Sequence, residues 1–264
     1  KQFHTPYHFS GWTASPSLPQ RRYPLSGTSR KPLGVCLQTL GYEKKHHFPV
    51  EFVGHPLIDA IHSRAKTDKE KFLKDNNLNN KPIIALLPGS RKQEISKMLS
   101  IMLSVADDFK EYQFVIAGAP SQDYHFYEKF LTTSNVKFVS NKTYDLLSVA
   151  TAALVTSGTA TLETALFKVP EVVCYKGNWI SYQIAKRIIT LKYISLVNLI
   201  MDKEVVKELI QDELNKKNLS IELSKLLNNE TREVILKNYD ILEEKLGGIG
   251  ASEKTAKFII NDIC

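Results

Sequence analysis

The segment KPIIALLPGSRKQEI, residues 81–95, decides the fold of this chain. Its apolar run at 83–87 indicates a buried strand, and Gly89 then allows the backbone to turn tightly. From residue 95 onward apolar side chains recur at helical spacing, which predicts a long helix over 93–112 with one apolar face. A buried strand that turns directly into an amphipathic helix is typical of α/β domains.

The same alternation extends across residues 50–175. The pattern predicts short apolar strands at 50–54, 113–120, 135–139, 153–158 and 170–175, and helices at 56–65, 121–133, 143–150 and 159–168. Because each crossover must return to the same end of the sheet, this alternation indicates parallel pairing. The expected fold class is therefore α/β, with a doubly wound parallel sheet.

The sequence on either side of this region has a different character. Residues 1–41 contain five prolines, many serines and no sustained period, which predicts an irregular arm, interpreted as the truncated or misread start of a longer gene. After Tyr175 the pattern predicts helices at 178–192, 205–211, 219–229, 231–246 and 251–263. We therefore expect one domain over 42–246 and, after a glycine-rich break, a helical C-terminal extension over 247–264.

The formal net charge of +7 is distributed unevenly along the chain. Residues 1–42 contain no Asp or Glu, and the remainder carries 30 basic and 28 acidic residues, which is close to neutral. A nucleic-acid-binding surface is therefore not expected in the folded domain. The basic residues of the arm are Lys1, Arg21, Arg22, Arg30 and Lys31.

The cysteines and the apolar runs indicate in which compartment the protein works and whether it crosses a membrane. Cys36, Cys174 and Cys264 are widely spaced and form no CxxC or Cys/His cluster, so neither a zinc site nor a disulfide framework is expected, and a reducing cytoplasm fits best. No apolar run approaches the ~18 residues that cross a bilayer. Any membrane contact is expected to be peripheral.

Two turns at the ends of predicted strands are candidates for ligand binding, because open α/β sheets bind ligands at the carboxyl ends of their strands. In the first turn, Gly89 and Ser90 lead into a helix, with Ser90 as its expected cap, and Arg91 offers a planar fork suited to phosphate oxygens. A capping box with Glu94 is the structural alternative.

The second turn, residues 155–163, ends a strand in small hydroxyl residues around Gly158. Free backbone amides and the positive end of the helix dipole are expected to face outward there, which makes the turn a ready anion site. Glu163 follows about one turn into the helix, where a carboxylate accepts hydrogen bonds from a ribose diol or simply stabilises the helix start. Neither a Walker A motif nor GxGxxG is present, which argues against a kinase, an ATPase or a standard dehydrogenase.

Taken in order, these motifs resemble those of lipid-A-disaccharide synthases. The resemblance rests on FVGHPLID (52–59), LLPGSRKQEI (86–95), SGTATLE (157–163), the strand ending at Tyr175-Lys176, and SLVNL (195–199), and it runs from about residue 42 to the C-terminus. One departure is visible, because Val197 stands where the family pattern has proline.

The resemblance implies the C-terminal, nucleotide-sugar-binding Rossmann-like half of a two-domain glycosyltransferase of the GT-B fold, with most of the N-terminal half missing. Such enzymes transfer 2,3-diacylglucosamine from UDP-2,3-diacylglucosamine to 2,3-diacylglucosamine 1-phosphate, releasing UDP. The acceptor site and the catalytic base would belong to the N-terminal domain, to which the helix in 247–264 would cross. Neither a metal nor another cofactor is implied.

The resemblance also assigns candidate roles to residues of this chain. The Ser157–Thr159 turn and Arg91 would stabilise the diphosphate, Glu163 and Asn198 would contact the ribose or the uracil, and Tyr175 would line the pocket. The expected UDP-sugar site comprises Gly89, Ser90, Arg91, Ser157, Gly158, Thr159, Glu163, Tyr175, Asn198 and Gln211.

The implied enzyme would work in the cytoplasm, peripheral to the inner membrane, and the resemblance is compatible with a homo-oligomer. The apolar and basic stretch 179–193 fits a membrane surface, although such a helix also packs on its own sheet. Two other functions stay open. One is an enzyme of the same fold, such as a UDP-N-acetylglucosamine 2-epimerase. The other is a fragment that binds UDP without catalysis.

Overall fold

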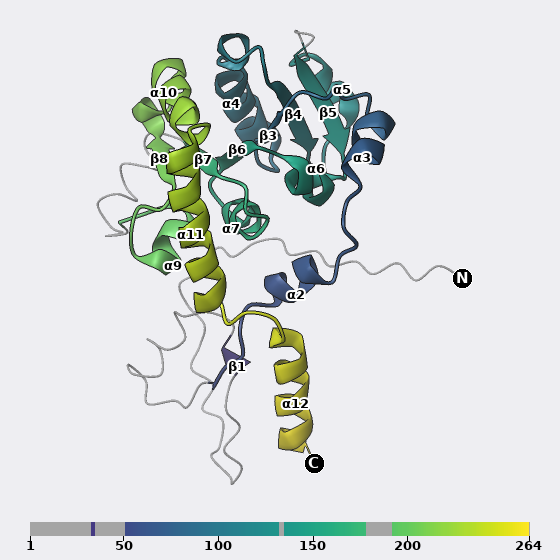
Figure 1. Ribbon diagram of the computed structural model, residues 1–264, viewed down its shortest axis with the longest axis vertical. Coiled ribbons are helices and arrows are strands. Elements are labelled where there is room, and N and C mark those ends of the chain that lie inside the picture. Colours follow the sequence, from purple (N-terminus) through teal and green to yellow (C-terminus); the bar gives the residue numbers. More distant parts are fainter. Residues whose placement is uncertain (1–32, 35–50, 132–134, 178–191, 264) are drawn as a thin grey trace. The chain divides into compact units, whose positions relative to one another are not determined.

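The computed structural model describes residues 33–34, 51–131, 135–177 and 192–263 (Figure 1). The arm expected over 1–41, apart from residues 33–34, and the helix expected at 178–192, apart from its last residue, lie outside these residues. Two short strands, β1 (Leu33–Gly34) and β2 (Glu51–Phe52), pair in parallel and precede the main sheet.

The core of the molecule is a parallel sheet of six strands in the order β5-β4-β3-β6-β7-β8. Counted along the chain from β3, this is the order 3-2-1-4-5-6 of the doubly wound nucleotide-binding folds. The expected doubly wound α/β architecture is confirmed. The strands are β3 (Ile83–Leu87), β4 (Gln113–Gly118), β5 (Val136–Ser140), β6 (Ala152–Thr156), β7 (Glu171–Tyr175) and β8 (Lys207–Ile210).

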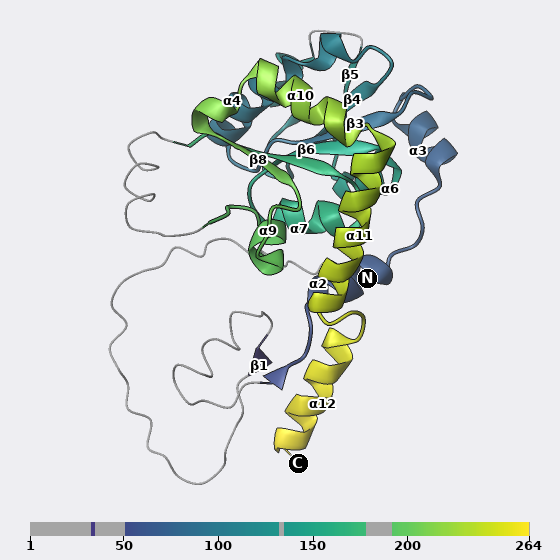
Figure 2. The same ribbon diagram turned by 60° about the vertical axis from the view of Figure 1, so that its left-hand side comes forward.

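Helices cover both faces of the sheet, and a helical segment forms the C-terminal end (Figure 2). The described helices are α2 (Pro56–His62), α3 (Lys69–Asp75), α4 (Lys92–Leu103), α5 (Tyr124–Glu128), α6 (Thr143–Val149), α7 (Thr159–Leu166), α9 (Leu196–Met201), α10 (Lys216–Leu226), α11 (Asn229–Lys245) and α12 (Ala251–Ile263). Helices α4 and α10 lie on one face, and α6 and α7 lie on the other.

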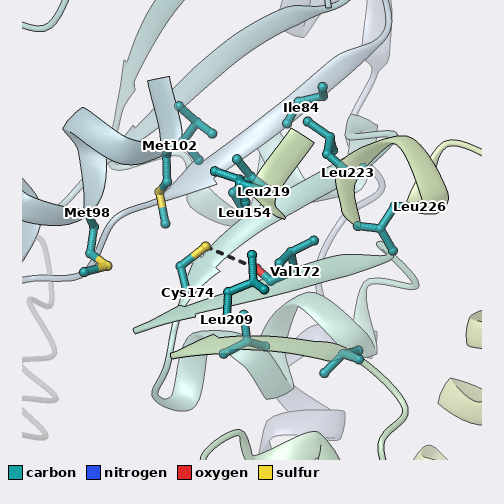
Figure 3. Packing of buried hydrophobic residues seen from close by; sticks show 14 of the residues in the cluster. Ile84, Met98, Met102, Leu154, Val172, Cys174, Leu209, Leu219, Leu223 and Leu226 are labelled. Atoms are coloured by element: carbon teal, nitrogen blue, oxygen red, sulfur yellow. Dashed lines mark hydrogen bonds between the residues drawn. The ribbon is translucent and has the colours of Figure 1, made fainter. Parts of the chain in front are cut away.

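Alternation along the central strands divides the core into two clusters. Even-numbered residues of β3 and β6, such as Ile84 and Leu154, pack with Met98 and Met102 of α4 and with Leu219 and Leu223 of α10 (Figure 3). Odd-numbered residues of the same strands pack against α3 and α6. Since β3 and β6 are buried along their whole length, they have the continuous apolar sequence that a sheet covered on both faces requires.

The structure corrects the expected secondary structure in three places. The helix predicted at 205–211 is wrong, because Lys207–Ile210 form the edge strand β8, paired with β7. The helix predicted over 93–112 ends at Leu103, where the hydroxyl and the amide of Ser104 both donate to the Ile101 carbonyl. Helix α3 was not predicted, although its N-cap Asp68 accepts a hydrogen bond from the Lys71 amide.

Candidate functional site

The carboxyl ends of β3 and β6 lie side by side, at the point where the strand order reverses. In open α/β sheets this switch point is where ligands bind. The structure has a cavity of about 290 Å³ there. Its walls come from the turn after β3, the loop after β4, the start of α6, and the turn and first helical turns after β6. The lining residues are Leu87, Gly89, Ser90, Glu94, Ala117, Gly118, Ala119, Pro120, Thr143, Thr156, Ser157, Gly158, Thr159, Ala160 and Glu163.

Gly89 shapes the wall after β3. Its φ of +101° lies in the region that disfavours residues with a Cβ, and a Cβ built there would lie 2.3 Å from Oε2 of Glu94. The same Glu94 oxygen accepts a hydrogen bond from the Ser90 amide at 3.3 Å. The turn therefore needs glycine, and it holds the Glu94 carboxylate back against the backbone.

The start of α4 differs from the expected cap. The N-cap is Arg91 rather than Ser90, and no side chain caps the helix. Glu94 is the third helical residue and reaches back to an amide, as in one half of a capping box. Ser90 and Arg91 are exposed, and Ser90 lines the cavity.

The turn after β6 supplies backbone donors. The Ser157 hydroxyl donates to the Ile194 carbonyl at 2.9 Å and the Ser157 amide to the Cys174 carbonyl at 3.2 Å, which fix the turn. The amides of Thr159 and Ala160, at the start of α7, have no acceptor among the described residues. Unpaired amides at a helix N-terminus carry partial positive charge, so this wall of the cavity suits an anion.

Glu163 is the acidic group of the cavity. Its Oε1 accepts a hydrogen bond from the Tyr144 hydroxyl at 2.8 Å, whereas Oε2 has no partner among the described residues. Burial raises the pKa of Glu163, and the Tyr144 hydrogen bond lowers it in part. Burial, together with the nearby Glu163 charge, raises the pKa of Tyr144, so its hydroxyl stays protonated and remains a donor.

A second cavity, of about 450 Å³, lies beside the first one and shares Glu94 and Thr156 with it. Its lining includes four cationic side chains and one carboxylate. Tyr175, the last residue of β7, also lines it. The structure thus brings Arg91 and Tyr175 together in this cavity. The lining residues are Arg91, Lys92, Gln93, Glu94, Lys97, Met98, Thr156, Tyr175, Lys176 and Gly177.

Two expected site residues lie elsewhere. Asn198 is fully buried in α9, where its Nδ2 donates to the Val206 carbonyl and to Glu208, and its Oδ1 accepts from the amides of Val205 and Val206. Its amide is thus fully used inside the protein. Gln211 follows β8, is 8% exposed and lines neither cavity. The structure therefore does not bring Asn198 or Gln211 to the cavities.

The sequence reasoning also missed residues that border the cavities. Thr143 lines the first cavity from the start of α6, and Ala119 and Pro120 line it from the loop after β4. Tyr144 does not line the cavity itself but donates a hydrogen bond to Glu163, which does. The AGAP segment after a predicted strand was an available signal, since strand ends on this side of the sheet were expected to meet. No pattern in the sequence around Tyr144 predicts its contact with the site, because its partner Glu163 lies 19 residues further along the chain.

No group of three or more His, Cys, Asp or Glu side chains lies close enough to hold a metal ion in the part of the chain that the structure describes. Among the same residues, no helix combines the length and the apolar character that a membrane span requires.

Comparison with known sequences points to one family. Residues 40–259 match the family model described as lipid-A-disaccharide synthetase. The chain is 36% identical over 216 residues to the lipid-A-disaccharide synthase of Syntrophus aciditrophicus, covering 78% of this chain and 56% of that protein. It is 34% identical over 224 residues to the Coxiella burnetii enzyme, covering 83% of this chain and 59% of that one. The chain therefore spans less than two thirds of the length of these relatives.

Comparison with solved structures supports the fold. The UDP-GlcNAc 2-epimerase from Neisseria meningitidis, bound to UDP-GlcNAc, superposes with a TM-score of 0.58 at 17% identity, covering 88% of this chain and 61% of that one. The S. aureus MnaA–UDP co-structure gives a TM-score of 0.57 at 17% identity, covering 84% and 57%. With the match over residues 40–259 and these identities, the chain belongs to the lipid-A-disaccharide synthetase family.

Proposed function

We propose that this chain is the donor-binding part of a glycosyltransferase of lipid A biosynthesis. The whole enzyme would transfer 2,3-diacylglucosamine from UDP-2,3-diacylglucosamine to 2,3-diacylglucosamine 1-phosphate. The domain over 42–246 would hold the UDP, and α12, within 247–264, would reach toward an N-terminal domain that carries the acceptor site. Family membership supports this reaction, since the matched relatives are named lipid-A-disaccharide synthases.

One observation carries the proposal: a single cavity at the switch point joins the turn at Gly89–Ser90 to the turn at residues 157–160. The amides of Thr159 and Ala160, which have no acceptor in the part of the chain that the structure describes, would face an anion, with the positive end of α7 behind them. Departure of UDP leaves negative charge on the diphosphate, and donors held in place before the reaction stabilise that charge. The exposed Arg91 side chain lines the adjoining cavity and would add a positive charge at the same edge of the sheet.

The lining residues of the cavity support a placement of the nucleotide. Glu163 lies one turn into α7 from the proposed diphosphate position, and one of its carboxylate oxygens has no partner within the described ranges, so it would accept from the ribose hydroxyls. The loop at Ala119–Pro120 would then border the uracil. Two proteins of the same fold, the Neisseria epimerase and MnaA, are described as bound to UDP-GlcNAc and to UDP, which supports a UDP-sugar here.

The binding step is tested by titrating UDP into the chain in a calorimeter. We expect Arg91→Ala to weaken UDP binding about 10- to 100-fold, because a charge-assisted contact with phosphate contributes roughly 1.5–3 kcal/mol. Lys254→Ala, on exposed α12, removes the same charge away from the cavity and should leave the affinity within twofold. Equal affinities of the Arg91→Ala variant and the unaltered chain would remove Arg91 from the site.

The reaction itself requires the full-length gene product. A radiolabelled UDP-2,3-diacylglucosamine assay with 2,3-diacylglucosamine 1-phosphate as the acceptor should yield the labelled disaccharide and UDP. The fold alone is shared with epimerases, so conversion of unacylated UDP-GlcNAc instead would support the epimerase alternative. Binding of UDP without either reaction would support the non-catalytic alternative.

A further inference from the structure

Tyr144 connects three segments that are far apart in the sequence. Its hydroxyl donates to Glu163 of α7 at 2.8 Å, and its ring packs at a tilt of 47° against Phe167, just after α7, with ring centroids 5.1 Å apart. The Arg64 guanidinium also lies over the same ring, 5.1 Å from its centroid. Tyr144 is therefore held through its ring as well as through its hydroxyl.

Arg64 is itself held in place. Its Nη2 donates to Oδ1 of Asp145 at 2.9 Å, and the Thr67 hydroxyl donates to the same oxygen at 3.0 Å. Asp145 is the neighbour of Tyr144 in α6, so these contacts tie the segment between α2 and α3 to the helix that carries Tyr144. The Tyr144 ring thus contacts both Arg64 and Phe167, and these contacts restrict the position of its hydroxyl.

We propose that Tyr144 is a positioning residue that makes this site selective for ribonucleotides over deoxyribonucleotides. The inference rests on the proposed function, in which Glu163 binds the ribose of UDP. By donating to Oε1, the Tyr144 hydroxyl would restrict the rotamer of Glu163, which lines the cavity, and leave Oε2, which has no partner among the described residues, available to the ligand. A carboxylate held in this way accepts hydrogen bonds from the vicinal 2′- and 3′-hydroxyls, and a deoxyribose leaves it without a partner.

The chemistry of the Tyr144–Glu163 pair explains why a tyrosine suits this positioning role. A phenol with a high pKa has a proton to donate at neutral pH, whereas a second carboxylate at this position would repel Glu163. The donated hydrogen bond favours the ionised, acceptor-only form of Glu163, which burial alone would disfavour. Ribose hydroxyls are donors, so an acceptor-only carboxylate matches them.

The test compares Tyr144→Phe with the unaltered chain, using UDP and 2′,3′-dideoxy-UDP as ligands in calorimetry. The variant retains the ring contacts with Phe167 and Arg64 and loses only the hydroxyl. We expect it to bind UDP about five- to tenfold more weakly, in line with the loss of one positioning hydrogen bond, and to bind the dideoxy ligand with unchanged affinity. Tyr112→Phe, at the amino end of β4 and away from the cavity, is the matched control.

Glu163→Gln provides the second arm of the test. If Tyr144 acts through Glu163, adding Tyr144→Phe to Glu163→Gln should cost little further UDP affinity, because the two residues are coupled. An equal loss for UDP and dideoxy-UDP in Tyr144→Phe, no loss for either ligand, or additive losses in the double variant would overturn the proposal. Failure of the unaltered chain to bind UDP would instead reject the proposed function, and the inference with it.

Discussion

Gly89 shows how one residue determines the wall of the cavity. Its positive φ strains any residue with a Cβ, and a Cβ there would also push aside the Glu94 carboxylate that accepts the hydrogen bond from the Ser90 amide. The sequence predicted a tight turn at Gly89, and the structure shows that a Cβ at this position would meet the side chain of Glu94.

We expect Gly89→Ala to destabilise the protein by about 1–3 kcal/mol, because alanine is strained at this φ and its Cβ would displace Glu94. Urea denaturation measures the loss. Gly248→Ala is the matched control, since Gly248 also has a positive φ, +61°, but a Cβ there meets nothing within 4 Å. If both variants lose the same stability, the contact with Glu94 contributes nothing.

At the scale of elements, α12 is attached to the rest of the chain through α2. Oδ1 and Oδ2 of Asp59 in α2 accept hydrogen bonds from the amides of Gly250 and Ser252, at 2.6 and 2.7 Å, at the start of α12. Next to this contact, Gly54 and Gly247 approach so closely that a Cβ on Gly247 would lie 2.8 Å from the Gly54 Cα. Asp59 thus caps the start of a helix that lies 191 residues further along the chain.

This cap makes the attachment of α12 dependent on pH. The amides of Ser252 and Gly250 lower the pKa of Asp59 below its ordinary value of 3.8. A depressed pKa in the folded state means that the stabilisation is present above pH 3.8 and is lost as the pH falls through the folded-state pKa. We therefore expect the NMR signals of the Gly250 and Ser252 amides to shift in a titration that ends below pH 3.8.

At neutral pH, Asp59→Ala should weaken the start of α12 by about 1 kcal/mol, the usual contribution of a capping carboxylate. Hydrogen exchange of the α12 amides measures this loss, and Asp107→Ala, at an exposed position in the turn after α4, is the control. Unchanged protection of α12 in Asp59→Ala would contradict the capping role.

At the scale of the molecule, the parallel sheet and its two layers of helices hold the two turns of the cavity in register. Both turns follow buried central strands, and β3 and β6 are paired in register from Ile84–Ala152 to Leu87–Val155. A ligand that bridges the turns after these strands therefore binds only the folded state, and its binding energy adds to the stability of the whole domain.

We expect UDP at about 100 times its dissociation constant to stabilise the chain by about 2.7 kcal/mol. For a protein of this size, that gain raises Tm by roughly 5–10 °C, which differential scanning fluorimetry detects. Uridine lacks the diphosphate and serves as the control. A shift of the same size with uridine at an equal concentration would show that the turn at residues 157–160 does not hold the phosphates.

The sequence alone determined the fold class, the positions of the central strands and the two turns that border the cavity. These features depend on local properties: apolar runs of strand length, helical periodicity, and glycine beside small hydroxyl residues. Family membership was also visible in the order of the motifs, and the comparisons confirmed it.

Only the tertiary structure decided the features that depend on distant partners. Residues 205–211 have an apolar pattern that also fits a helix, and pairing with β7 makes β8 a strand. Asn198 lies in the SLVNL motif, but its side-chain oxygen accepts hydrogen bonds from the amides of Val205 and Val206 and is not available to a ligand. Tyr144 beside Glu163 and Asp59 beside Gly250 are contacts across 19 and 191 residues, and chain folding, not local sequence, brings such groups together.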